Sequence, residues 1–174
     1  MEKTLHLTMS IVPGVAKRGR HAVILLENDH GNYLLGAKSI YPKDIYRVIG
    51  GGIEEGEEAL PAAARELFEE TGLELPQDQL KHLSTITAEI DETSTGKHYT
   101  FVTDLYLANV GNHNLVASDD IQGLQELTRG DIQQLITRYQ QLPRELDADK
   151  GFSWFDYGQL YGAIHQIALD SLGN

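Results

Sequence analysis

The 174-residue chain contains no cysteine, which excludes a disulfide framework, a thiolate metal site and a cysteine nucleophile. It also lacks any run approaching the roughly 20 apolar residues that a membrane-spanning helix needs. At the N-terminus a short mixed apolar run contains Pro13, and basic residues follow it rather than precede it, unlike a secretory signal. These absences predict a cytoplasmic protein with no membrane association.

Positive charge is scarce, because 14 basic residues face 26 acidic ones and the formal net charge is −12. Nucleic-acid surfaces need clustered lysine and arginine, so we expect no stable nucleic-acid binding. The acids are unevenly spread: residues 51–73 hold seven glutamates and one arginine, which is half of the net negative charge. An anionic ligand could bind there only together with divalent cations.

The remaining composition, 41% hydrophobic and 23% charged, is that of an ordinary globular protein. Its length suffices for one domain with a full hydrophobic core, and two independent domains would be small. We therefore predict a single domain over residues 1–174, with a core at about 18–142 and an N-terminal strand and C-terminal helix as extensions. These extensions could support a homodimer.

Apolar runs and turn residues predict an alternation of strands and helices. Strands are expected at residues 4–12, 22–26, 33–37, 46–49, 82–91, 98–109 and 124–127, with hairpins joining the second to the third and the fifth to the sixth. Helices are expected at 58–71, at 128–140 and from Ser153 onward, the last two opened by the cap signals Thr128 with Asp131 and Ser153 with Asp156. On the last helix, Phe155, Tyr161, Ile164 and Ala168 should form one apolar face. The mixture is typical of a single α+β or sandwich-type domain.

The chemistry is concentrated in residues 51–73, where a glycine-rich turn leads into a glutamate-rich helix. At 100° per residue Glu66, Glu69 and Glu70 share an arc of about 100°. A separate apolar stripe is formed by Leu60, Ala64, Leu67 and Phe68. This pattern predicts a helix that buries one side and presents three acids on another. Neighbouring carboxylates destabilise an isolated helix by a few tenths of a kcal/mol per pair, which indicates a bound cation.

Carboxylate oxygens favour the hard cations Mg²⁺, Mn²⁺ and Ca²⁺, and phosphate oxygens often complete the Mg²⁺ shell. Cations at this helix would neutralise a diphosphate and activate a water for displacement at phosphorus. A carboxylate not fully engaged by metal could take the proton of that water. Arg65 could pair with Glu69 one turn on or with Glu57 near the helix start, and we assign it an orienting role.

The stretch resembles the Nudix box at every defined position. Gly51 is followed after five residues by Glu57, and after seven more by the run RELFEETGL at 65–73. Gly50 and Gly56 also fit the extended form of the box, although Ile49 stands where many relatives have proline. The resemblance implies the Nudix fold, an α+β architecture of the α/β/α sandwich type, in which a mixed β-sheet lies between helices and the box forms a loop–helix–loop.

The resemblance also implies a function: hydrolysis of the diphosphate linkage in a small-molecule nucleoside diphosphate joined to another moiety, with Mg²⁺ or Mn²⁺ as cofactor. The expected metal ligands are Gly51 (through its carbonyl), Glu57, Glu66, Glu69 and Glu70. Catalytic roles are expected for Glu66, Glu69 and Arg65, with Glu66 or Glu69 as the general base. Substrate contacts are expected from Gly50, Gly51, Gly52 and Arg47.

Other interpretations compete with this one. A charge run is often only a solvated helix face, but the complete spacing of the box argues against that. A Nudix-fold module could bind a nucleotide or nucleotide sugar without cleaving it, yet such modules commonly lose box residues, and all are kept here. Isoprenoid diphosphate isomerisation requires a cysteine in the family's known form. Subgroups of the family often carry a marker residue downstream of the box, such as a proline or a tyrosine. The substrate stays open, because residues 74–91 contain no tyrosine and their only proline, Pro76, directly follows the box.

Signals outside the box are weaker. Further acids could come from a loop across the cleft, although a solvated loop acid is the simpler interpretation for each candidate: Asp91, Glu92, Asp119 and Asp120. His21 and His30 lack an acid or histidine partner at ligand spacing, which indicates no metal-binding role. Trp154 and the tyrosines nearby are expected in core or helix packing rather than in a base-stacking surface.

Overall fold

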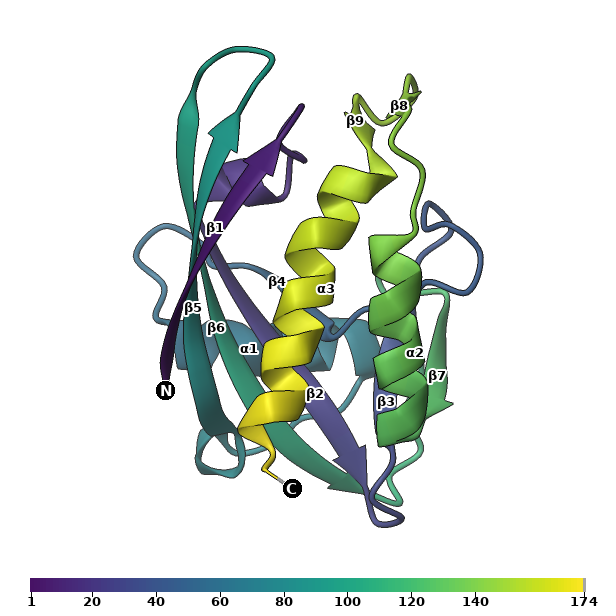
Figure 1. Ribbon diagram of the computed structural model, residues 1–174. Coiled ribbons are helices and arrows are strands. Elements are labelled where there is room, and N and C mark those ends of the chain that lie inside the picture. Colours follow the sequence, from purple (N-terminus) through teal and green to yellow (C-terminus); the bar gives the residue numbers. More distant parts are fainter. Residues whose placement is uncertain (174) are drawn as a thin grey trace.

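The computed structural model describes residues 1–173, which form a mixed β-sheet covered by helices on both faces. The sheet has seven strands in the order β1-β5-β6-β2-β3-β7, and β4 pairs with β2 outside this path. Helix α1 packs on one face, and α2 and α3 lie side by side on the other (Figure 1). This arrangement confirms the predicted α+β fold with a mixed sheet between helices.

The sheet strands are β1 (Glu2–Met9), β2 (Arg20–Asn28), β3 (Tyr33–Ala37), β4 (Ile49–Gly52), β5 (Lys81–Glu92), β6 (His98–Gly111) and β7 (Gly123–Leu127). A separate ribbon pairs β8 (Leu146–Asp147) with β9 (Phe152–Ser153). The helices are α1 (Ala59–Thr71), α2 (Arg129–Gln140) and α3 (Trp154–Ser171), with 3-10 turns η1 (Ala16–Arg18) and η2 (Gln77–Gln79). Both predicted hairpins are present, since β2 pairs antiparallel with β3 and β5 with β6.

Two strand predictions were wrong by three residues at one end or both, and the others differ from the structure by no more than two. The first strand ends at Met9 instead of continuing to residue 12. The strand predicted at 46–49 lies further on, because β4 runs from Ile49 through the glycines and pairs with β2, with Gly51 opposite Ala22. A strand made of glycines has no alternation of apolar and polar side chains, so periodicity cannot reveal it.

Helix α1 begins and ends where the sequence predicts, but it buries a different face. Glu58 is the N-cap, and Gly72 ends the helix at φ 71° and ψ 2° in the left-handed region. The buried residues are Ala62, Ala63, Glu66, Leu67, Glu70 and Thr71. Phe68 of the predicted apolar stripe is instead 54% exposed. Two of the three clustered acids therefore lie on the packed side of the helix, beside small alanines that allow close approach.

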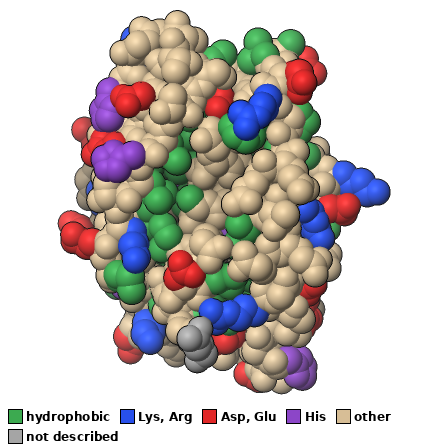
Figure 2. All heavy atoms as spheres, viewed as in Figure 1, with side chains coloured by type: hydrophobic (Ala, Val, Ile, Leu, Met, Phe, Trp, Pro, Cys, Tyr) green, Lys and Arg blue, Asp and Glu red, His purple; other side chains and the backbone are tan. Residues whose placement is uncertain are grey.

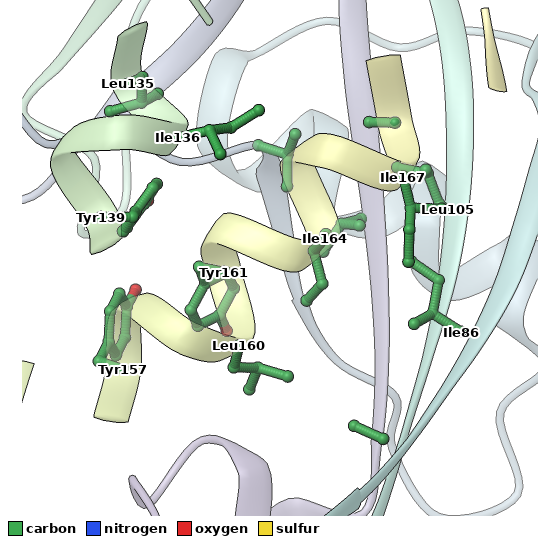
Figure 3. Close-up of a cluster of buried hydrophobic side chains, with 14 of the residues drawn as sticks. Ile86, Leu105, Leu135, Ile136, Tyr139, Tyr157, Leu160, Tyr161, Ile164 and Ile167 are labelled. Atoms are coloured by element: carbon green, nitrogen blue, oxygen red, sulfur yellow. The ribbon is translucent and has the colours of Figure 1, made fainter. Parts of the chain in front are cut away.

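Helices α2 and α3 close a hydrophobic cluster over the opposite face of the sheet. Figure 3 shows Ile164 and Ile167 of α3 near Leu105 and Ile86 of the strands, with α2 side chains beside them. The predicted cap signals are present: Thr128 and Asp131 form a reciprocal capping box, and Ser153 accepts from the Asp156 N–H. On the predicted apolar face of α3, Tyr161, Ile164 and Ala168 are buried. Phe155 is only partly buried and lies under the Arg144 guanidinium.

Asp156 fastens the N-terminal segment to the start of α3. Its carboxylate is buried and accepts from the Ser10 hydroxyl at 2.7 Å, the Ser10 N–H at 3.1 Å and the Ile11 N–H at 3.3 Å. These bonds position the loop that follows β1 beside the first turn of α3.

We expect Asp156→Ala to lower the free energy of unfolding by about 2–4 kcal/mol, because it leaves several donors without their acceptor. Urea denaturation measures this loss. Asp149→Ala, on an exposed turn of the β8–β9 ribbon, is the matched control and should change stability by no more than about 0.5 kcal/mol. Similar losses in the two variants would contradict the fastening role.

Within residues 1–173, no helix is both long and apolar enough to cross a membrane. On the face shown in Figure 2, the lysine and arginine side chains of the described residues are scattered among acids and form no broad basic area. The absence of stable nucleic-acid binding stays a prediction, as do the single-domain organisation and the cytoplasmic location.

Candidate active site

A cavity of about 480 Å³ brings together residues from both faces of the sheet. The glycines of β4 line it, together with an acidic group from α1 and from the loop before β7: Glu66, Glu69, Glu70, Asp119 and Asp120. Aromatic rings from β9 and α3 line it as well: Phe152, Trp154 and Tyr157. Its volume lies within the range of roughly 300–1,000 Å³ that is usual for small-molecule sites.

Arg65 draws three glutamates of the box together. Its Nε and Nη2 donate to the two carboxylate oxygens of Glu57 at 3.0 and 2.9 Å, and its Nη1 donates to Glu66 at 2.8 Å and to Glu69 at 3.1 Å. Nη2 also donates to the Gly52 carbonyl at 3.1 Å. Arg65 thus makes both of the contacts considered from sequence, and its hydrogen bonds lower the pKa of Glu57. One guanidinium offsets the mutual repulsion of these acids.

Glu70 is the most deeply buried of the clustered acids, at 2% exposed. One of its carboxylate oxygens accepts from the Gly50 N–H at 2.8 Å. Burial raises the pKa of Glu70 to about 7, and the Gly50 hydrogen bond and the Arg47 charge oppose this rise only in part. Burial also raises the pKa of Glu66, against the effect of Arg65. A cation beside these carboxylates would stabilise their charged forms.

The glycines of β4 allow this close packing. A Cβ at Gly51 would lie 2.7 Å from both carboxylate oxygens of Glu66, so that carboxylate rests directly against the Gly51 backbone. Gly50 has a φ of +133°, and a Cβ there would lie 2.1 Å from the Ala22 carbonyl oxygen of β2. Only glycine fits either position without displacement of its neighbours.

The chemistry of the donor set fits a hard divalent cation, because it consists of carboxylate oxygens and a backbone carbonyl. Glu57, Glu66 and Glu69 are turned toward Arg65, whereas Glu70 is turned toward the Gly50 N–H. In the part of the chain that the structure describes, no three histidine or acidic side chains are arranged to hold a metal ion. The close approach of Glu66 to Gly51 and the unfavourable burial of Glu70 are the features that a cation would complement.

Arg47 places a buried positive charge in the cavity wall, at 7% exposed. Its Nη1 donates to the Tyr161 hydroxyl at 3.0 Å and to the Tyr157 hydroxyl at 3.4 Å, and its Nη2 donates to the Gly50 carbonyl at 3.1 Å. Among residues 1–173, no carboxylate forms an ion pair with it. A buried guanidinium with neutral partners favours an anionic ligand.

The four loop acids considered from sequence divide into two pairs. Asp119 and Asp120 line the cavity, and Asp120 forms an ion pair with Lys38. The other pair lies elsewhere, since Asp91 bonds His98 at 2.8 Å and the buried Glu92 accepts from the Val12 N–H at 2.6 Å. Glu92 therefore holds the loop after β1 and does not line the cavity.

Sequence reasoning missed His21 and undervalued Trp154. His21 lies on β2 opposite Gly52, is 1% exposed and lines the cavity. Its position beside the glycines of β4 becomes visible only through the pairing of β2 with β4. Trp154 belongs to the hydrophobic cluster, as expected, and also lines the cavity. His30 lies in the exposed turn between β2 and β3.

The fold and the box place the chain in a family of hydrolases. A model of the NUDIX domain matches residues 17–155, and the chain therefore belongs to the Nudix family of pyrophosphohydrolases. Enzymes of this family typically depend on a divalent metal. No curated protein sequence gives a significant match to the chain.

Solved Nudix structures share the fold. A C. elegans Ap4A hydrolase is 18% identical with a TM-score of 0.55, and the match covers 88% of this chain and 96% of that one. The NUDIX domain of Shewanella oneidensis NrtR, complexed with ADP ribose, is 16% identical with a TM-score of 0.53, over 85% and 87% of the two chains. A MutT/nudix family protein from Enterococcus faecalis is 23% identical with a TM-score of 0.51, over 62% of this chain and 42% of its own.

Proposed function

We propose that this protein hydrolyses the diphosphate linkage of a nucleoside diphosphate joined to another moiety, with Mg²⁺ or Mn²⁺. The observation that carries the proposal is the meeting of two kinds of charge in one cavity: acids of the box beside Gly51, and the buried Arg47 without an acidic partner. The acids suit cations and Arg47 suits a phosphate. A diphosphate that arrives with its cations complements both.

The residues of the box have different roles in the proposed reaction. Gly51, Glu57, Glu66, Glu69 and Glu70 would hold the cation. When bound, that cation would neutralise diphosphate oxygens and make phosphorus more open to attack by water. Glu66 or Glu69 takes the proton of the attacking water as general base. Arg65 orients the glutamates through the hydrogen bonds described above.

The substrate contacts come from Arg47 in the cavity wall and from the backbone of the β4 glycines. Arg47 donates to a phosphate oxygen in addition to its phenolic partners, and the extended backbone of Gly50, Gly51 and Gly52 lets the diphosphate approach closely. The water oxygen forms a bond to one phosphorus of the P–O–P linkage, and the bond from that phosphorus to the bridging oxygen breaks. The general base takes one water proton, and the products are the nucleoside monophosphate and the phosphorylated other moiety.

A substrate panel tests the proposal. We expect release of a phosphate-containing product from at least one nucleotide sugar, dinucleoside polyphosphate or (d)NTP when Mg²⁺ or Mn²⁺ is present, and no release when EDTA removes the metal. Ion-exchange chromatography of the products measures the reaction and shows which bond is cut. If the wild-type protein is inactive across the panel but binds one member tightly, the alternative holds: the protein is a module that binds a nucleotide or nucleotide sugar without cleaving it.

We also propose that the protein acts in the cytoplasm as a single domain. The outer strands of the sheet are β1 and β7. A homodimer through β1 or through α3 would show as a doubled mass in size-exclusion chromatography with light scattering.

A further inference from the structure

Two residues that line the cavity have buried polar atoms without a hydrogen-bond partner. Among the described residues, the buried side-chain nitrogens and oxygens without a hydrogen-bond partner are Nδ1 and Nε2 of His21 and the hydroxyl of Tyr41. Both residues line the same cavity. Burial raises the pKa of Tyr41, and the nearby Tyr157 phenol raises it further, but the geometry of the Tyr41 hydroxyl gives it no hydrogen-bond partner. Unpaired buried polar atoms are costly and rare in native proteins, and a ligand is one reason for their retention.

His21 is held as a neutral ring. Burial lowers its pKa well below the usual value, and the charges of Arg47, Lys38 and Arg18 lower it further. A neutral imidazole offers one N–H donor and one nitrogen acceptor. Its ring centroid lies 5.6 Å from that of Phe101 and 6.3 Å from that of Tyr161, the second pair edge to face. His21 is therefore a neutral ring in an aromatic setting whose donor and acceptor are both unused.

The rings of the C-terminal segment supply an apolar wall to the same cavity. Trp154 and Tyr157 both line it and pack edge to face with centroids 5.1 Å apart. The indole N–H of Trp154 donates to Asp147 at 2.9 Å, so this ring is fixed and its own polar atom is already satisfied. Tyr41 stands 6.2 Å from Tyr157 between ring centroids. The wall thus offers flat apolar surface beside the unpaired groups.

We propose that His21 and Tyr41 bind the edge of the nucleobase of the substrate, and that the face of the base packs against Trp154 or Tyr157. A nucleobase is planar and apolar on its faces and carries both donors and acceptors on its edge, which matches the unpaired groups and the wall. This subsite rests on the proposed function, in which the diphosphate occupies the neighbouring glycines. His21 pairs with Gly52 across β2 and β4, so the base subsite directly adjoins the place of the diphosphate.

The chain carries its own reporter for this subsite, because Trp154 is its single tryptophan. Titration of the metal-free protein with AMP, GMP, CMP and UMP should quench the fluorescence of Trp154 saturably for at least one of them. Ribose 5-phosphate, which has the sugar and phosphate but no base, should cause no comparable quenching. Equal quenching by ribose 5-phosphate would show that the occupant is a sugar phosphate, and no quenching by any monophosphate would refute the subsite.

Two variants remove the unpaired groups and keep an aromatic ring at each position. Tyr41→Phe and His21→Phe should each weaken binding of the best monophosphate by about tenfold, the size of one hydrogen bond between buried groups. Tyr41→Phe should not lower the thermal midpoint of unfolding, because it removes only a polar atom that has no partner. His21→Phe also places a larger ring at a buried position, so its affinity is compared only if its unfolding transition shows that it folds. Loss of affinity without loss of stability separates a ligand-binding role from a structural one.

Tyr99→Phe is the matched control, since it deletes a phenolic hydroxyl on β6 outside the cavity and should leave binding unchanged. Unaltered affinity in Tyr41→Phe and His21→Phe would overturn the proposal. If His21→Phe does not fold, Tyr41→Phe alone decides. These titrations need no catalysis, so a protein that fails the substrate panel but passes here would lack the proposed hydrolysis and still possess the base subsite.

Discussion

Glu70→Gln should reduce Mg²⁺-dependent hydrolysis by about 10²–10³-fold while the protein remains folded. Glu70 is the most buried acid of the cluster, and its carboxylate is bonded to the Gly50 N–H. Glutamine has nearly the same shape and can still accept that hydrogen bond, but it carries no charge for a cation. The rate with the best panel substrate at saturating Mg²⁺ measures the loss.

The folded state of this variant should be at least as stable as that of the wild type without metal, because burial already disfavours the charged form of Glu70. Circular dichroism and thermal unfolding check this. Glu55→Gln is the matched control: it neutralises an exposed glutamate of the same box and should keep nearly full activity. Activity retained in Glu70→Gln, or lost equally in Glu55→Gln, would contradict the assigned role.

The bounds of α1 could be predicted from local signals, whereas its buried face could not. Gly72 adopts the left-handed conformation that ends a helix, and this preference belongs to the residue itself. Hydrophobic pattern alone places Phe68 inside and Glu70 outside, yet the structure does the opposite. The buried face of α1 is set by the strand that packs against it. The glycines of β4 approach α1 closely, and alanines with the glutamate carboxylates fit that narrow space better than a phenyl ring does.

The acidic half of the cavity could be located from sequence because its residues lie within one short motif. The other half could not, since it depends on contacts between distant parts of the chain. Arg47 donates a hydrogen bond to Tyr161, which lies 114 positions further along the chain. His21 lies beside the glycines only because β2 pairs with β4. The sequence contains no periodicity or spacing that relates the C-terminal rings to these residues. From the sequence alone, Trp154 is therefore expected to be an ordinary core residue, and its place at the cavity follows only from the packing of α3 on the sheet.

The largest loss of stability is expected from Gly50→Ala, at about 3–5 kcal/mol. A methyl group at this position would lie 2.1 Å from the Ala22 carbonyl oxygen and 2.7 Å from the Val23 Cα, both of which belong to the backbone of β2. Neither atom can move without disturbing the pairing of β2 with β4. The φ of +133° adds strain for any residue with a side chain. Urea denaturation measures the loss.

Gly56→Ala separates the two causes of this loss. Gly56 also has a positive φ, +78°, but a Cβ there would meet nothing within 4 Å. Strain alone should therefore cost about 1–2 kcal/mol at Gly56, and the difference between the variants reports the collision with β2. Because the Gly50 N–H holds Glu70, Gly50→Ala should also reduce hydrolysis in whatever fraction stays folded, whereas Gly56→Ala should not. Equal losses of stability would show that the backbone conformation, rather than the contact between β4 and β2, demands glycine at position 50.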